Sequence, residues 1–300
     1  MAFIVSRFLP TLSIDKITKE EKEKYTSPLP SEFVASIKDK SQDLFAVKSL
    51  VATYGFQYSS VVGMLIFLMN TTTELQFAIR KLAKFNALPG KKHFRAIIHL
   101  LHYIRVHRLE IGLRFYSPNE KPAIQQLLTK TNPDFKFEDH PIILFSDSSW
   151  QDCPDTSRST GCYLVYIYGS LVDGASFVPT PIAMSSAQAE YNACAFATIM
   201  GMHVIQVFNK FHNLHADSPL TMALFVDSSS AIAMMKNEKD SKKTRHIQRR
   251  VHFVRTARID GTIQPWKIPG PDNPADIGTK NLAGAPFSSF HKVLHVEVPP

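Results

Sequence analysis

The hydrophobic residues between positions 58 and 116 recur with a helical spacing. In "KKHFRAIIHLLHYIRVH" the apolar residues repeat about every 3.6 positions, and the stripe consists of Phe94, Ile97, Ile98, Leu101 and Ile104. Upstream, "SSVVGMLIFLMN" and "TTTELQFAIRKLAKFN" each begin with hydroxyl residues suited to N-capping, and "LPGKK" interrupts the pattern. The pattern predicts a small all-helical unit over 58–116 with its polar faces outward.

From residue 142 onwards, short apolar runs alternate with helical segments. "PIILFSD", "TMALFVDSS" and "TIQPWKIPG" have the length of strands, and "GCYLVYIYGSLVDGASFV" predicts a hairpin around Gly169 and Ser170. "SSAQAEYNACAFATIMGMHVIQVFNKF" predicts a long helix with Ser185 as N-cap and Gln188 completing a capping box. "SSAIAMMKN", "TRHIQRRVHFVRTARIDG" and "NPADIGTKNL" predict a short helix, a basic amphipathic helix and the start of a last helix. This order predicts the α/β class, with a mixed sheet flanked by helices.

These patterns divide the chain into five segments. Residues 1–57 are mixed and polar and stay poorly defined, and 58–116 form the helical unit. Residues 117–141 are rich in proline and polar residues, which favours a linker. The α/β domain covers 142–282, and 283–300 are expected to be an irregular tail.

Composition limits the class of protein. The 300 residues, of which 44% are hydrophobic, suffice for one large or two ordinary domains. No run reaches the roughly eighteen unbroken apolar residues of a membrane span, and the N-terminus shows no signal peptide. The three cysteines are widely spaced, so neither a disulfide framework nor a zinc site is indicated. We expect an intracellular protein, cytoplasmic or nuclear, without a membrane partner.

Basic residues are concentrated in two separate blocks, within a net charge of +8. The first lies in the helical unit, between Thr71 and Tyr116, and the second runs from Lys236 to Arg258. Two such blocks favour a polyanionic partner, most simply a nucleic-acid backbone. The alternative is that each block is an ordinary solvated helix face.

Carboxylates occur at the ends of the predicted elements. Asp147 and Asp227 each close an apolar strand, whereas Glu190 and Asp276 lie near predicted helix starts. If these acids converge, their repulsion requires cations, and carboxylate oxygens are the ligands that Mg²⁺ or Mn²⁺ prefers. Taken singly, each acid is better explained as a turn former or a helix cap, so the prediction depends on the set.

Five motifs of the predicted α/β domain together resemble those of a known family. "SDSSWQDCPDTSRSTGCYLVYI", "SSAQAEYNA", "LFVDSSSAIAM", "TRHIQRRVHFVR" and "NPADIGTK" together resemble the ribonuclease H domain of copia-type LTR retrotransposon polyproteins. The helical unit is similar to the thumb and connection segment that follows the polymerase palm in the same polyproteins. The resemblance covers most of 58–282 and implies a ribonuclease H-like fold preceded by a small all-helical thumb/connection-like unit.

The resemblance also implies roles for individual residues. It makes Asp147, Glu190, Asp227 and Asp276 the catalytic and metal-binding quartet for two Mg²⁺ or Mn²⁺ ions. Contacts to nucleic acid are implied for a further set, whose members are Arg158, Ser159, Thr160, Ser186, Ser228, Arg245, His246 and Arg249.

The implied function is hydrolysis of the RNA strand of RNA–DNA hybrids. No paired-aspartate polymerase motif and no integrase pattern occurs in the sequence, so we expect neither DNA synthesis nor integration from this chain. A reverse transcriptase polymerase region of the same element is the candidate protein partner beside the RNA–DNA hybrid. Two departures from the family pattern leave an alternative open. Ser228 stands where the family usually has Asn, and "WKIPGPDNPAD" lacks a histidine before Asp276, although His246 or His252 would be a substitute. The alternative is an inactive nucleic-acid-binding remnant of the same element.

Overall fold

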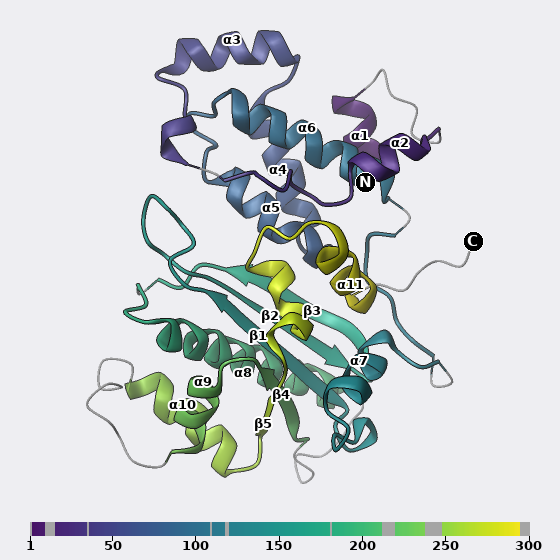
Figure 1. The fold of residues 1–300 in the computed structure, drawn as a ribbon, viewed down its shortest axis with the longest axis vertical. Helices are drawn as coiled ribbons and strands as arrows, with labels where there is room; N and C mark the ends of the chain where they lie inside the picture. Colours follow the sequence, from purple (N-terminus) through teal and green to yellow (C-terminus); the bar gives the residue numbers. More distant parts are fainter. Residues whose placement is uncertain are drawn as a thin grey trace. The chain divides into compact units, whose positions relative to one another are not determined.

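The computed structural model describes residues 2–9, 16–34, 36–108, 110–117, 120–180, 182–211, 220–237 and 248–294. The chain divides into two compact units, and Figure 1 shows the elements of both. The first unit combines residues 1–113 with 280–300, and the second comprises residues 114–279.

The second unit is built on a five-stranded sheet with the order β3-β2-β1-β4-β5. The strands are β1 (Ile142–Ser149), β2 (Thr160–Ile167), β3 (Ser170–Phe177), β4 (Met222–Val226) and β5 (Ile263–Lys267). The pairs β1–β2 and β2–β3 are antiparallel, whereas β1–β4 and β4–β5 are parallel. The predicted mixed sheet and the predicted hairpin are therefore confirmed, since Tyr168 and Gly169 turn the chain between β2 and β3.

Helices α8 (Ser186–Phe211), α9 (Ser229–Lys236) and α10 (Gln248–Ile259) contribute to one hydrophobic core with the sheet (Figure 1). Leu144 and Val165 of the sheet share this core with Cys194 of α8 and Val251 of α10. Among the described residues, α8 is the single helix that is long and apolar enough on composition to cross a membrane, and the bent pair α3 (Leu44–Tyr54) and α4 (Tyr58–Leu68) would be a second candidate. Core helices pass the same test, and α8 contributes Tyr191, Cys194 and Ala197 to the core.

The segment 117–141 differs from the predicted linker because it contains α7 (Ala123–Thr131), in which Ile124 and Leu128 are buried. Phe135, four residues after α7, packs edge-to-face on Phe225 and Trp266 of the sheet. Proline and polar residues dominate this segment, but its few apolar side chains gain stability by covering the sheet. The composition of residues 117–141 therefore did not indicate that this segment contains a packed helix.

The first unit is helical throughout its described regular elements. These are α1 (Ala2–Phe8), α2 (Lys19–Lys24), the 3₁₀ turn η1 (Ile37–Asp39), α3 (Leu44–Tyr54), α4 (Tyr58–Leu68), α5 (Thr73–Ala83), α6 (Lys91–Val106) and α11 (Gly284–Leu294). The predicted helical unit is therefore larger than 58–116. Residues 1–57 contribute buried side chains such as Leu29 and Phe56, and the expected irregular tail contains α11, whose Phe287 packs against Tyr103.

The apolar stripe of α6 is confirmed, with Phe94, Ile97 and Leu101 fully buried. Arg105 was expected on an outward polar face of the helical unit. Instead, it is only 1% exposed and forms an ion pair with Glu21 of α2. Two histidines on the polar side of α6 are also partly covered, since Tyr25 stacks on His102 and meets His99 edge-on. The N-terminal segment covers this face of α6, which no local pattern in 58–116 predicts.

Four predicted helix starts differ in detail. Helix α4 begins after Gln57, which makes no side-chain cap, and the hydroxyl of Thr72 before α5 donates to the Leu68 carbonyl oxygen. Ser185 caps α8 as predicted by accepting from the Gln188 amide, but the Gln188 side chain accepts from Met184 instead of closing the box on Ser185. Asp276 lies in a short 3₁₀ turn, η5 (Pro274–Gly278), instead of opening the last helix.

Candidate metal centre

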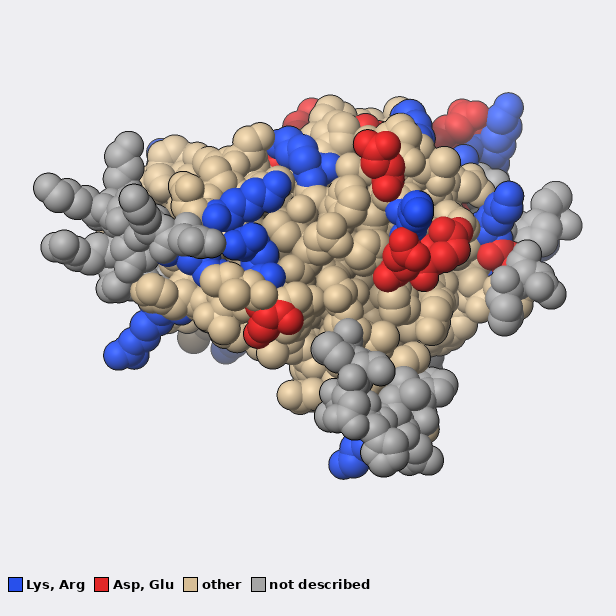
Figure 2. Space-filling view, turned by 90° about the horizontal axis from the view of Figure 1, so that it is seen from below, with Lys and Arg blue, Asp and Glu red and all other residues tan. Residues whose placement is uncertain are grey.

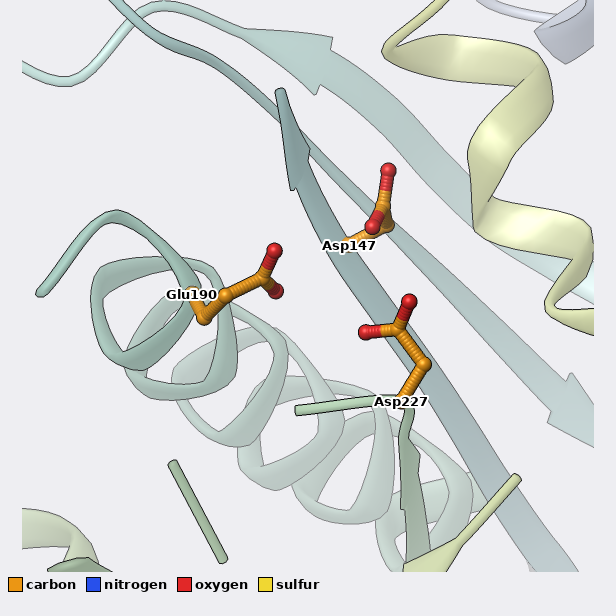
Figure 3. A group of neighbouring side chains, drawn as sticks. All are labelled: Asp147, Glu190 and Asp227. Carbon is orange, nitrogen blue, oxygen red and sulfur yellow. The ribbon is translucent and has the colours of Figure 1, made fainter. Parts of the chain in front are cut away.

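Three carboxylates converge at the end of the central strands. Asp147 extends from β1, Glu190 from α8 and Asp227 from the residue directly after β4, and their carboxylates point toward one another (Figure 3). One oxygen of each lies within 4.8 Å of those of the other two. Asp147 is 1% exposed, and the other two are half-buried.

The sheet register explains why the two aspartates meet. Strands β1 and β4 are parallel and adjacent, and Ser146 lies opposite Val226. The next residue on each strand is therefore an aspartate, so both carboxylates occur at the carboxyl edge where ligand sites of α/β sheets collect.

Helix α8 supplies the third acid through its packing on β1. The Cys194 thiol lies 3.4 Å from the Ser146 hydroxyl, in the core between helix and strand. Glu190 precedes Cys194 by one helical turn and therefore shares its face. The apolar packing of α8 thus directs the Glu190 carboxylate toward Asp147.

The turn η5 holds Asp147 from the other side. The Thr279 hydroxyl, at the end of this turn, donates to Oδ2 of Asp147, and its residue is 1% exposed. The Asn273 amide donates to the Ser146 carbonyl oxygen at 2.9 Å, and its Oδ1 accepts from the Ala275 amide at 3.2 Å. These hydrogen bonds attach residues 273–279 to β1 beside the carboxylate cluster.

Asp276 is buried in η5 but is not part of the group whose oxygens lie within 4.8 Å of one another. Burial raises the pKa of the Cys162 thiol, and the negative charges of Asp147 and Asp276 raise it further. The carboxylates of Asp147 and Asp276 are therefore both near enough to the buried Cys162 thiol to raise its pKa. The structure brings together three of the four predicted acids and places the fourth in the adjacent turn.

The donor set suits a hard divalent cation. Three carboxylates at this separation repel one another, and a cation between them removes that repulsion. Oxygen donors of this type are those that Mg²⁺ and Mn²⁺ prefer. The nearby Lys267 ammonium donates to the main-chain carbonyl oxygen of Asp227. The acidic triad Asp147, Glu190 and Asp227 is thus a candidate metal centre.

The residues expected at the nucleic acid are spread over several elements. Ser159 and Thr160 are buried at the start of β2, where they accept from the Gln151 amide and donate to Asp152, respectively. Arg158 is exposed beside them. These hydroxyls therefore support the loop between β1 and β2, and contact between Arg158 and nucleic acid stays a prediction.

The other expected contact residues lie near helix starts. Ser186 is the exposed first residue of α8, and Ser228 caps α9 by accepting from the Ala231 amide at 3.2 Å. Arg249 is exposed on α10, whereas Arg245 and His246 lie outside the described residues. Their roles at nucleic acid remain predictions.

Sequence reasoning missed two residues that shape the site. Thr279 and Asn273 both fall in or beside the "NPADIGTK" motif that was used only for its aspartate. A hydroxyl and an amide near a predicted metal ligand were an available signal. Their partners, however, are 132 and 127 positions away, so local pattern could not identify them.

The chain is 28% identical over 229 residues to the Retrovirus-related Pol polyprotein from transposon TNT 1-94 of Nicotiana tabacum, covering 74% of this chain and 15% of that protein. It is 22% identical over 245 residues to the corresponding polyprotein from transposon RE1 of Arabidopsis thaliana, covering 81% of this chain and 15% of that protein. No protein-family model matches the chain.

Among solved structures, RNase H1 from the archaeon Halobacterium salinarum is similar with a TM-score of 0.33 and 14% identity, over 45% of this chain and 89% of that one. The strand order and register described above define the fold class.

The sheet order, the flanking helices and the acidic cluster define a ribonuclease H-like domain, joined in sequence to a helical unit. The chain is similar in sequence to part of the copia-type retrotransposon Pol polyproteins and spans about 15% of the length of the curated relatives it matches.

Proposed function

We propose that this chain hydrolyses the RNA strand of RNA–DNA hybrids with two bound Mg²⁺ or Mn²⁺ ions. The observation that carries the proposal is the convergence of Asp147, Glu190 and Asp227 within 4.8 Å at the carboxyl edge of the sheet. Asp276 is proposed as the fourth ligand, because it is buried in the turn that Thr279 attaches to Asp147.

The proposed roles follow from the positions of the side chains. The three carboxylates bind the cations and fix them on the framework of β1, β4 and α8. The hydrogen bond from the Thr279 hydroxyl fixes the orientation of the Asp147 carboxylate within the site. When bound, two such ions supply an activated water and stabilise the leaving oxygen of a phosphodiester. The expected products carry 5′-phosphate and 3′-hydroxyl ends.

The proposed substrate contacts lie beside this centre and on α10. Figure 2 shows Lys and Arg side chains gathered on the side of the domain where α10 lies. Arg250 donates to Asn192 of α8 at 2.6 Å, whereas Arg249 is exposed and suited to a phosphate. The Ser186 and Ser228 hydroxyls are proposed to contact phosphate or the RNA 2′-hydroxyl, which distinguishes RNA from DNA. A polymerase region of the same element is the proposed protein partner.

Cleavage of a labelled hybrid by the purified chain tests the proposal. We expect cutting of the RNA strand in Mg²⁺ or Mn²⁺, loss of cutting in Asp147→Asn and Glu190→Gln, and retained hybrid binding in both. Asp134→Asn is the matched control, because Asp134 is an exposed acid of the same unit outside the cluster. A folded wild-type chain that leaves the hybrid intact in both metals would refute the proposal.

The second candidate is a nucleic-acid-binding remnant without hydrolysis. The position of Asp276 outside the 4.8 Å group favours it, since a complete quartet is then not formed. The cap that Ser228 provides for α9 also explains that residue without substrate. In this case the hybrid binds, but divalent ions do not change the stability of the second unit.

A further inference from the structure

The first unit contains a basic pocket, and its lining residues are distant in sequence from the three carboxylates. It has a volume of about 360 Å³ and is formed by the end of α2, the following loop and the first half of α6. All of its lining residues belong to residues 1–113. Neither the acidic triad nor the proposed hydrolysis involves them.

The loop that forms one wall is held in place by two histidines of α6 and by His107, which directly follows this helix. The Tyr25 ring stacks on His102 with 4.6 Å between the ring centroids. His99 Nε2 lies 3.0 Å from the Ser27 carbonyl oxygen, and His107 Nε2 lies 2.9 Å from that of Tyr25. Since a carbonyl only accepts, each of these ring nitrogens carries the proton. The wall is therefore preorganised before any ligand enters.

The inner surface of the pocket is apolar and partly aromatic. Tyr25 and Phe33 are each 8% exposed, and Ala96, which also lines the pocket, is 1% exposed. Pockets of roughly 300–1,000 Å³ with such a lining and few polar groups are typical of sites for small organic ligands. This lining suits a planar heterocycle better than a hydrated ion alone.

The rim carries an excess of positive charge. Lys24, Lys92 and Arg95 are exposed there, with Glu32 as the opposing acid. Lys92 bonds Asp39 at 3.2 Å, so part of its charge is already compensated. Arg95 has no hydrogen bond or ion pair with any residue that the structure describes. Its guanidinium is thus available for a phosphate, which it can bind in a bidentate manner.

We propose that this pocket binds one nucleotide of an unpaired nucleic-acid strand. The base lies against Tyr25, Phe33 and Ala96, and the phosphate binds Arg95 and Lys24. A paired base is already stacked and hydrogen-bonded inside its duplex, so it cannot enter a pocket; an unpaired base can contact the apolar wall. The site would thereby hold a single-stranded segment, independently of whether the chain hydrolyses hybrids.

The test is equilibrium binding of a fluorescent oligouridylate of about eight nucleotides to the full chain at fixed salt. Arg95→Gln should weaken binding about tenfold, the effect of losing a charged hydrogen bond, and Glu32→Gln should strengthen it about twofold by removing a repelling charge. Lys91→Gln is the matched control, because Lys91 is an exposed cation of the same helix outside the pocket, and it should change affinity by less than about twofold. Circular dichroism and melting establish that each variant is folded.

Competition and a duplex identify the ligand. UMP should displace the oligonucleotide, whereas uridine, which lacks the phosphate, should not, and Arg95→Gln should leave the affinity for an RNA–DNA duplex nearly unchanged. The proposal is overturned if Lys91→Gln weakens binding as much as Arg95→Gln, or if the Arg95 variant loses duplex and single strand equally. It is also overturned if a glutamate-rich peptide of equal charge binds as tightly as the oligonucleotide.

Discussion

The Thr279 hydroxyl donates a hydrogen bond to Oδ2 of Asp147, although 132 positions separate the two residues in the chain. The same hydroxyl lies 3.3 Å from the Asp276 carbonyl oxygen, so Thr279 joins the η5 turn to the most buried acid of the triad. Metal ligands commonly depend on such an outer partner for their orientation.

Substitutions of Thr279 test whether its hydrogen bond orients the Asp147 carboxylate, because they leave the charge of the acidic triad unchanged. Thr279→Val keeps the volume but removes the donor, so we expect the Mg²⁺ concentration for half-maximal response to rise about 10- to 100-fold. Thr279→Ser restores the hydroxyl and should restore most of the affinity. The measurement is metal titration followed by melting temperature and by hybrid cleavage. An unchanged Mg²⁺ dependence in the valine variant would show that the hydrogen bond does not position Asp147.

Divalent ions should stabilise the folded chain if the triad binds them. A ligand that binds only the folded state contributes about 2.7 kcal/mol at a concentration 100 times its dissociation constant. We therefore expect the melting temperature of the wild type and of Asp134→Asn to rise with added Mg²⁺ or Mn²⁺, and that of Asp147→Asn to respond far less. Equal responses in all three proteins would place the bound ion elsewhere.

His93 should make the first unit sensitive to acid. Burial lowers its pKa to about 4, from 6.5 for the unperturbed group. Its Nδ1 accepts a hydrogen bond from the Gly90 amide at 2.9 Å, and its ring stacks on Phe85. The unfolded chain takes up the proton first, so the stability that His93 contributes is complete above about pH 6.5 and is lost as the pH falls toward 4.

By about pH 5 this loss should amount to roughly 2 kcal/mol. Glutamine at position 93 can still accept from the Gly90 amide but does not titrate, so His93→Gln should have a flatter pH dependence between about pH 7 and pH 5. Urea unfolding of both proteins across this range provides the measurement. Parallel curves for the two would contradict the prediction, since other groups would then account for the acid sensitivity.

Gly278 has no room for a side chain. A Cβ there would overlap the Cys162 sulfur and would lie 2.9 Å from the Cys162 Cβ. We expect Gly278→Ala to destabilise the second unit by about 1–3 kcal/mol, the effect of overpacking a core, and to displace the turn that carries Thr279. Cys162→Ala in the same chain should recover part of this loss. Additive effects of the two substitutions in thermal unfolding would show that they do not share the same space.

The candidate site was partly predictable because some of its signals are local. Apolar runs predicted β1 and β4, and each run is followed closely by an aspartate, so the sequence placed Asp147 and Asp227 at strand ends. The parallel pairing of β1 and β4 that brings the two together was not predicted. Glu190 followed from its place near the start of the predicted long helix. For Asp276 the prediction of a helix start was wrong, because prolines and glycines around it form a short 3₁₀ turn instead.

The sequence by itself determined the type and order of most elements, the mixed α/β class and the positions of the acids along them. These properties depend on residues that are neighbours in the chain, where the period of side-chain directions is fixed by the backbone. The tertiary structure alone decided that Arg105 is buried against Glu21, that residues 117–141 pack on the sheet and that Thr279 holds Asp147. Each of these features depends on a partner that is distant in sequence. Which buried groups come into contact is therefore decided by how whole helices and strands pack together.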